Sequence, residues 1–234
     1  MSTPDVLKRT PLFNIHTSLG ALIVPFAGWE MPLQYASILK ESRAVRDSAG
    51  LFDVSHMGRI EITGPGADTF MGQILGSRVL GLKVGRGRYS LICNQEGGIL
   101  DDCIVYRTSG KRFFLVSNAA NHKLVLDWLS HWAVEHTRVR IEDITDNFAM
   151  VSLQGPNAAT TLSNLLPVEA TLIKPFSVIE TKIGNVDTLL ARTGYTGEDG
   201  FELVVHNKSA GPIWKLMTDL GAVTCGLGAR DILR

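Results

Sequence analysis

The chain has 234 residues, of which 45% are hydrophobic, and its 23 Lys and Arg balance its 23 Asp and Glu. This length permits one large domain or two closely packed ones. The balanced charge lacks the positive excess of proteins that bind nucleic acid, so we expect no nucleic-acid partner. The longest apolar runs, such as 21–25 and 186–191, are far shorter than the roughly 20 residues of a membrane-spanning helix. We therefore expect a soluble protein without a membrane partner.

The N-terminal segment and the cysteines indicate a cytoplasmic protein. Residues 1–11 contain basic side chains but no apolar export segment behind them. Cys93, Cys103 and Cys225 are widely spaced, and no pair has the two-residue spacing of a metal or redox motif. The histidines also lack a metal-ligand pattern. We expect free thiols in a reducing cytoplasm and no metal site.

The first half of the chain predicts a strand, a helix, three strands and a second helix. Ile60 and Ile62 alternate as in a strand, and Gly64-Pro65 leads into apolar residues at helical spacing. The expected elements are a strand from 59, a helix over 67–74, strands near 88–93, 99–107 and 112–117, and a helix over about 119–135.

The second half repeats this order. Gly155-Pro156 again follows a short strand and precedes a helix. Strands joined by short turns, with few helices between them, favour antiparallel sheets covered on one face by helices. We predict a duplicated α+β fold. The expected elements are a strand over 149–153, a helix over about 159–166, strands near 176–181, 186–192 and 201–206, and a helix from about 212.

Two adjacent carboxylates, Asp101 and Asp102, interrupt an apolar strand of the first half. Strand side chains alternate, so only Asp102 shares a face with Ile104 and Tyr106. A carboxylate against an apolar face can serve as an acid, a base or an orienting group. The alternative is a solvated acid beside a turn.

In the second half, the polar loop 192–200 contains three glycines that would let the backbone approach a ligand closely. Glu202 lies between two apolar residues of the next strand, so it faces either solvent or a pocket. His56 is a candidate general base, with a structural hydrogen-bonded histidine as the alternative. The segment 226–231 lacks the full spacing of a nucleotide-binding loop.

Seven segments, taken in order across the whole chain, resemble the T-protein of the glycine cleavage system. Their order along the chain and their residue identities together make the resemblance specific. They are Arg9-Thr-Pro-Leu12, Phe26-Ala-Gly-Trp-Glu-Met-Pro32, Phe52-Asp-Val-Ser-His-Met-Gly58, Gly97-Gly-Ile-Leu-Asp-Asp102, Ser117-Asn-Ala-Ala-Asn121, Arg192 to Glu202 and Gly226 to Asp231.

The resemblance implies a folate-binding fold in which one domain is inserted into another. We place the insert at 57–142, and the first domain at 1–56 plus 143–234. Family members continue through a Leu-Glu-Ala-Gly-like segment into a C-terminal barrel that provides another folate-contacting arginine. We expect this chain, which ends at Arg234, to lack that barrel.

The resemblance also implies a reaction and its participants. The lipoylated H-protein carries an aminomethyl group, tetrahydrofolate accepts the methylene carbon, and ammonia leaves. Asp102 matches the family's catalytic aspartate, and Glu202 matches its pterin-binding glutamate, which suits the N–H edge of the ring. Core packing remains an alternative for one of the tyrosines, Tyr106. The other residues placed around folate are Met57, Tyr89, Tyr106, Asn118, Tyr195 and Arg230.

Relatives with other functions leave alternatives open. Proteins that assist iron–sulfur cluster assembly carry a cysteine where this chain has Arg192-Thr-Gly-Tyr195, which disfavours that function. Sarcosine-type dehydrogenases need a preceding flavin domain, which does not fit before Arg9. The remaining alternatives to an aminomethyltransferase are a folate-dependent demethylase, a non-catalytic folate-binding module, and a scaffold that docks a lipoylated partner.

Overall fold

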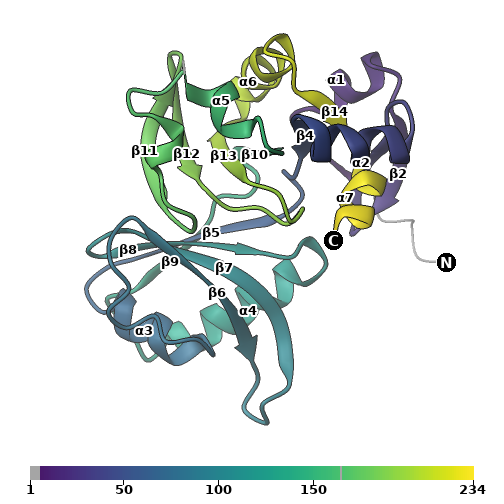
Figure 1. Ribbon diagram of the computed structural model, residues 1–234. Coiled ribbons are helices and arrows are strands. Elements are labelled where there is room, and N and C mark those ends of the chain that lie inside the picture. Colours follow the sequence, from purple (N-terminus) through teal and green to yellow (C-terminus); the bar gives the residue numbers. More distant parts are fainter. Residues whose placement is uncertain (1–5, 164) are drawn as a thin grey trace, which may run out of the picture. The chain divides into compact units, whose positions relative to one another are not determined.

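The computed structural model describes residues 6–163 and 165–234 (Figure 1). They form two compact units. The first unit contains the chain up to His56 together with Asn147–Pro175 and Glu180–Arg234. The second unit contains Met57–Asp146 and Phe176–Ile179. The first unit contains two sheets and the second unit contains one, and each unit has its own helices.

The N-terminal part of the first unit is a small sheet with two helices. Its three strands have the order β1-β3-β2, with β3 parallel to β1 and antiparallel to β2. The N-cap hydroxyl of Ser37 accepts a hydrogen bond from the Lys40 N–H at 3.3 Å, which fixes the start of α2. The elements are β1 (Lys8–Arg9), α1 (Phe13–Ser18), β2 (Leu22–Phe26), β3 (Trp29–Gln34) and α2 (Ile38–Asp47).

A six-stranded sheet, in the order β11-β12-β13-β10-β4-β14, forms the rest of the first unit. Strand β10 is antiparallel to both β13 and β4, and β14 is parallel to β4. The strands are β4 (Gly50–Asp53), β10 (Phe148–Gln154), β11 (Val178–Ile183), β12 (Val186–Ala191), β13 (Gly200–His206) and β14 (Val223–Cys225). The helices are α5 (Ala158–Ser163), η2 (Ala170–Leu172), α6 (Asn207–Asp219) and α7 (Leu227–Leu233).

The second unit has a five-stranded antiparallel sheet in the order β6-β7-β8-β5-β9. Helices α3 and α4 cover one face of it, and Phe70 and Leu129 share a buried core with Val105 and Leu115 (Figure 1). The elements are β5 (Gly58–Thr63), α3 (Ala67–Ile74), β6 (Arg86–Cys93), β7 (Ile99–Ser109), β8 (Arg112–Ser117), η1 (Ala119–Asn121), α4 (His122–Ala133) and β9 (Arg140–Asp143).

The predicted duplication is present in the topology. The series β5-α3-β6-β7-β8-α4 in the second unit has the same order as β10-α5-β11-β12-β13-α6. The sheets repeat it as well, because β6-β7-β8-β5 corresponds to β11-β12-β13-β10. The predicted α+β class with mainly antiparallel sheets is thus confirmed.

Two details of the second unit differ from the pattern read in the sequence. The helix expected from about 119 starts as the short 3-10 helix η1, and regular α4 begins only at His122. The segment Phe176–Ile179 also belongs to this unit, which the sequence did not predict. The Gly87 N–H donates to the Phe176 carbonyl at 2.7 Å, and the Val178 N–H donates to the Gly85 carbonyl at 2.9 Å. These backbone bonds attach the segment to the start of β6.

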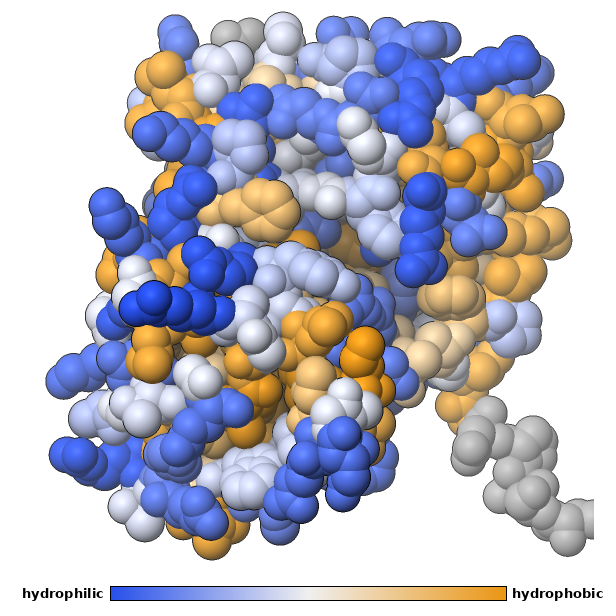
Figure 2. Space-filling model, turned by 60° about the horizontal axis from the view of Figure 1, so that its bottom comes forward, coloured by the Kyte–Doolittle hydropathy of each residue, from blue (hydrophilic) through white to orange (hydrophobic). Residues whose placement is uncertain are grey.

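The surface is mixed in polarity. Hydrophobic side chains emerge as separate patches among hydrophilic ones (Figure 2), in line with exposed large apolar residues at scattered positions such as Leu39, Ile99 and Val134. Single exposed apolar residues are normal for a folded protein. Within 6–163 and 165–234, no helix is both long and apolar enough to cross a membrane.

Candidate functional site

The predicted folate residues fall into two groups, one in each unit. The second unit contains five of them and the first unit contains three. Each group can be built from the elements that carry it. The group of the second unit is Met57, Tyr89, Asp102, Tyr106 and Asn118, and the group of the first unit is Tyr195, Glu202 and Arg230.

In the second unit, Asp102 and Asn118 are brought together. Asp102 lies on β7 and is exposed, and Asn118 follows β8, the neighbouring strand. The Asn118 side-chain amide donates to Asp102 Oδ1 at 2.5 Å and to the Asp102 carbonyl at 3.2 Å. Within the described parts of the chain, no hydrogen bond to Asp102 Oδ2 is seen. This oxygen can therefore accept a hydrogen bond from a ligand.

Asp101 positions Asn118 through hydrogen bonds, a role that the sequence analysis did not predict. Its carboxylate is only 3% exposed and accepts the Asn118 backbone N–H at 2.9 Å and the Asn118 side-chain amide at 3.0 Å. The Asn121 side-chain amide adds a third bond at 2.8 Å. Charge-assisted bonds of this kind are the stronger ones in proteins. They fix the start of η1 and orient the Asn118 side-chain amide toward Asp102.

The burial of this acid pair bears on an alternative that the sequence left open. The sequence allowed Asp102 to lie against an apolar face or to be a solvated acid beside a turn, and in the structure Asp101 is the buried acid and Asp102 the exposed one. The reason is that α3 and α4 cover the sheet face that carries Cys103 and Val105, and Asp101 shares that face by strand alternation. Asp102 is therefore an accessible carboxylate rather than a desolvated one.

The other predicted residues of the second unit differ in exposure. Tyr89 on β6 is 52% exposed and can offer a ring to a ligand. Tyr106 is 1% exposed, and its ring stacks on Phe114 with centroids 6.2 Å apart. The packing role left open for Tyr106 matches this environment, and its contact with folate stays a prediction. Met57 is half-buried, and its carbonyl accepts a bond from Arg59 at 2.6 Å.

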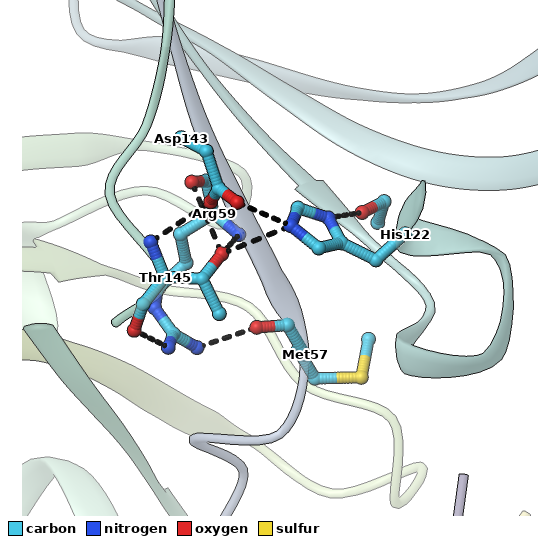
Figure 3. Close-up of polar contacts among 6 residues, drawn as sticks. Met57, Arg59, His122, Asp143 and Thr145 are labelled. Carbon is cyan, nitrogen blue, oxygen red and sulfur yellow. Dashed lines mark hydrogen bonds and ion pairs between the residues drawn. The ribbon is translucent and has the colours of Figure 1, made fainter. Parts of the chain in front are cut away.

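A polar cluster fixes the chain around Met57 (Figure 3). Arg59 is fully buried and donates to the carbonyls of Met57 and Thr145, the latter at 2.7 Å. Figure 3 shows the sulfur of Met57 pointing away from the guanidinium. His122 Nε2 lies 2.9 Å from the carboxylate of Asp143. Burial opposes ionisation of Asp143, but hydrogen bonds from His122 and Thr145 outweigh it and lower its pKa to about 2.

His122 also contacts Ser117, which gives a serine–histidine–aspartate arrangement. The Ser117 hydroxyl lies 3.1 Å from His122 Nδ1, opposite the nitrogen that faces Asp143. Ser117 is fully buried, however, so its hydroxyl cannot meet a substrate. The cluster therefore links the start of α4 to β9 and is not a nucleophilic triad.

In the first unit, the glycine-containing loop 192–200 is held in one conformation. Arg192 forms a two-pronged ion pair with Asp199, with contacts of 2.9 and 2.7 Å. The Gln154 amide donates to the Thr193 carbonyl at 3.1 Å. A Cβ atom at Gly194 would collide with the Gln154 side chain. Glycine is needed at this position because the Gln154 side chain packs against it, whereas the sequence suggested that a ligand approaches the backbone there.

Glu202 on β13 is half-buried beside this loop. Its Oε2 accepts the Thr193 hydroxyl at 2.6 Å. Its charge also acts on Arg230: burial lowers the pKa of Arg230, and the negative charge of Glu202 opposes that change. Glu202 and Arg230 thus form one electrostatic pair.

Arg230 and Tyr195 line a mostly apolar cavity of about 280 Å³. The Arg230 guanidinium lies 4.1 Å from the centroid of the Tyr195 ring, within the range of a cation–π contact. Flat ligands are favoured by such a lining, because aromatic and aliphatic walls accept their faces while a few polar groups orient them. The other lining residues are Val24, Phe26, Leu33, Leu227, Gly228 and Asp231.

A buried glutamate fixes the helix that carries Arg230. Glu41 is 1% exposed and accepts the backbone N–H groups of Tyr35 at 2.8 Å and Ala36 at 2.9 Å. Its second oxygen accepts the Gly226 N–H, at the N-cap of α7, at 2.8 Å. A Cβ at Gly226 would collide with the Leu33 carbonyl, so glycine is needed for this close approach. Sequence reasoning missed Glu41, because its partners lie far apart in the chain.

A second buried network supports the same unit. His16 Nε2 lies 2.9 Å from Asp53, and both side chains are fully buried. Burial opposes ionisation of Asp53, but hydrogen bonds from His16 and Ser55 dominate and lower its pKa to about 2. The candidate base His56 is 3% exposed and packs edge-on against Phe26. This packing favours the structural alternative for His56.

The described residues contain no group of three or more His, Cys, Asp or Glu that could hold a metal ion. The three cysteines are free thiols. Burial is the main cause that raises the pKa of both Cys103 and Cys225 to about 12. They are therefore protonated at neutral pH and unreactive as nucleophiles.

Comparison with known proteins finds similarity to one family. Residues 12–234 match the family model described as the GCVT N-terminal domain. Over 236 residues the chain is 43% identical to the aminomethyltransferase of Bacillus licheniformis, and the match covers 98% of this chain and 64% of that relative. The chain thus spans slightly less than two thirds of this curated relative.

Solved structures show the same similarity. The glycine cleavage system aminomethyltransferase T from Bartonella henselae matches with a TM-score of 0.89 and 37% identity, over 97% of this chain and 62% of that one. Heterotetrameric sarcosine oxidase from Corynebacterium sp. U-96 matches with a TM-score of 0.62 and 16% identity. That second similarity concerns the fold alone.

Proposed function

Because this chain belongs to the glycine cleavage system T-protein family, we propose that it binds tetrahydrofolate and transfers a one-carbon unit to it. The donor in this proposal is the aminomethyl group of the lipoylated H-protein, and ammonia is released. The observation that carries the proposal is the exposed Asp102 carboxylate, which Asn118 holds at one oxygen with a 2.5 Å hydrogen bond.

Asp102 has the properties that the chemistry requires. The folate nitrogens are the nucleophiles that accept the carbon. Asn118 fixes Asp102 Oδ1, so Oδ2 is the oxygen that can accept a proton from a folate nitrogen or stabilise positive charge as ammonia leaves. Asp101 contributes indirectly, because its three hydrogen bonds preserve the orientation of Asn118.

The residues of the first unit fit a pterin-containing ligand. Glu202 can accept paired N–H bonds from the pyrimidine edge, a geometry in which carboxylates bind strongly. The Tyr195 ring and the apolar cavity of about 280 Å³ suit a flat aromatic group. Arg230, held over Tyr195 at 4.1 Å, supplies a cation for a carboxylate of the ligand. Met57, Tyr89 and Tyr106 remain proposed folate contacts of the second unit.

The domain boundaries and the location are parts of the same proposal. We propose 1–56 plus 143–234 as the first folate-binding domain and 57–142 as the insert, with residues 143–146 and 176–179 packed in the second unit. A cytoplasmic location is supported by three free cysteines, which a reducing compartment maintains. A non-catalytic folate-binding role stays open in the experiment below, because the chain spans only 64% of its relative.

Titration calorimetry with tetrahydrofolate and an assay with aminomethyl-loaded H-protein test the proposal together. The parent chain is expected to bind tetrahydrofolate with one site and to release ammonia. Asp102→Asn keeps the hydrogen-bonding shape but removes the charge, so it should retain binding and lose turnover. Binding without ammonia release by the parent would identify a folate-binding module. No binding by the folded parent would contradict the proposal.

A further inference from the structure

One stretch of the second unit departs from the balanced charge of the chain. The sequence has equal numbers of basic and acidic residues, yet no Asp or Glu occurs between Asp68 and Glu96. Four basic residues occur in this interval. They are Arg78, Lys83, Arg86 and Arg88.

These four side chains surround one concave site. The loop after α3 and the start of β6 enclose a cavity of about 480 Å³, a size typical of small-ligand pockets. No acidic residue contributes to its lining. The lining residues are Arg78, Leu80, Gly81, Leu82, Lys83, Arg86, Gly87 and Arg88.

Two of the guanidinium groups are held in place by neutral acceptors. Arg86 donates to the Ser177 hydroxyl at 2.5 Å, and Arg88 donates to the Arg78 carbonyl at 2.5 Å. Beside them, Arg107 lies opposite Arg86 across the strand pair and donates to the Leu82 carbonyl at 3.0 Å. A neutral acceptor fixes a cation without cancelling its charge. Arg86 and Arg88 are therefore preorganised, and these contacts do not cancel their charges.

Several basic side chains elsewhere in the molecule are neutralised by direct ion pairs. One such pair joins Arg46 to Glu198 at 2.7 Å. Further pairs join Arg9, Arg112, Lys123, Arg140, Lys182, Arg192 and Lys215 to acidic residues. In contrast, none of the four cavity cations is seen in an ion pair within the described ranges 6–163 and 165–234.

The cavity is also distinct from the proposed folate group of its own unit. Along β6, Arg86 and Arg88 alternate with Tyr89, so they face the opposite side of the sheet from that tyrosine. Arg88 pairs across the strands with Val105, which belongs to the helix-covered core. A ligand on Tyr89 and Asp102 would thus not occupy this cavity.

We propose that this cavity is a binding site for a small polyanion, a molecule with two or more phosphate or carboxylate groups. Three arginines supply planar guanidinium groups that can bind phosphate or carboxylate with two hydrogen bonds, and Lys83 adds a fourth positive charge. A small ligand is favoured over a protein surface, because the cations converge on one concavity. The site is independent of the proposed aminomethyl transfer.

Calorimetric titration of inorganic tripolyphosphate and of citrate into the full chain at physiological ionic strength tests the site. We expect saturable binding of at least one of them with one site per chain, and the two probes separate a phosphate ligand from a carboxylate ligand. The double variant Arg78→Gln/Lys83→Gln removes two exposed charges whose side-chain heads make no hydrogen bond among the described residues. It should weaken binding about tenfold or more.

A matched control distinguishes loss of a specific site from a general effect of lower positive charge. Lys123→Gln/Lys215→Gln removes two charges from exposed helix ion pairs elsewhere and should leave the affinity unchanged. Arg86→Gln/Arg88→Gln should weaken binding as the first variant does. Absence of saturable binding by either probe, or equal weakening in the control, would overturn the site. Binding of an acidic peptide in the absence of binding by either small probe would overturn it in favour of a protein partner.

Discussion

The two units share one strand order but place their proposed ligand residues on different elements. In the second unit Asp102 lies on β7, and its partner Asn118 follows β8. In the first unit the corresponding strands are β12 and β13, and Glu202 lies on β13 beside the loop 192–200. The repeated framework therefore sets where strands and helices lie, while side chains near strand ends and in the adjoining loops set the chemistry.

Each unit also contains a buried carboxylate that supports its proposed ligand residues, and the two can be compared. Asp101 organises two asparagine side chains, whereas Glu41 organises three backbone N–H groups. Each unit further has a histidine–aspartate pair at 2.9 Å, but His16–Asp53 is fully buried and His122–Asp143 is partly exposed. The same contact should thus have different strengths in the two units.

The largest expected effect concerns Asp102, the proposed catalytic carboxylate of the second unit. Asp102→Asn should lower turnover by about 10²- to 10⁴-fold, the range for loss of a positioned acid or base. The dissociation constant for tetrahydrofolate should change little. Asp127→Asn, on the exposed side of α4, is a matched control. A variant with normal turnover would move the catalytic role away from the second unit.

The next largest effect is expected for the buried pair of His16 and Asp53 in the first unit. His16→Gln is expected to cost about 3 to 5 kcal/mol in the free energy of unfolding, because it leaves the Asp53 charge buried without its partner. His122→Gln should cost no more than about 1 kcal/mol, because Asp143 is 37% exposed. Urea denaturation measures both. Equal losses would show that burial does not distinguish the pairs.

These pairs also predict an acid-sensitive fold. The pKa of Asp53 is about 2 in the folded chain and near 4 when unfolded, so its charge stabilises the fold above about pH 4. That contribution, about 2 kcal/mol, is lost as the pH falls from about 4 to about 2. Urea denaturation near pH 6 and near pH 3 checks the sign. The same comparison on His16→Gln should give a smaller dependence on pH over this range.

The anchors of the two proposed sites should have intermediate effects. Glu41→Gln can retain one acceptor oxygen for Tyr35 and Ala36 but not the bond to Gly226, so we expect a loss of about 1 to 3 kcal/mol. Asp101→Asn should cost a similar amount in the second unit. Both should also weaken tetrahydrofolate binding. Stable variants with parental affinity would show that neither anchor positions a ligand residue.

The smallest effect is expected at the contact between Arg230 and Tyr195. Arg230→Lys keeps the charge but removes the planar group over the ring, so tetrahydrofolate affinity should fall by about 0.5 to 1 kcal/mol. Unfolding should be almost unchanged. The same titration of Arg234→Lys is a control, since Arg234 lies farther from the ring, at 5.6 Å. Equal losses in both variants would contradict a specific role for Arg230.

Local sequence patterns predicted the repeated elements well, because periodicity and turn residues are local signals. Alternation correctly placed Asp101 and Asp102 on opposite faces, but it could not tell which face α3 and α4 would cover. Glu41 and His16 were missed because each has a partner distant in sequence, Gly226 and Asp53 respectively. Gly194 was associated with a ligand, although its neighbour is Gln154. Contacts of this kind depend on tertiary packing, which periodicity does not encode.

The most direct test of the account is calorimetric titration of tetrahydrofolate into the parent chain, Glu202→Ala and Glu169→Ala. Glu202 is half-buried beside Thr193, whereas Glu169 is an exposed glutamate of the same unit. The account predicts binding by the parent and by Glu169→Ala, with a loss of about tenfold or more in Glu202→Ala. Parental affinity in a folded Glu202→Ala chain would contradict the assignment of the folate site.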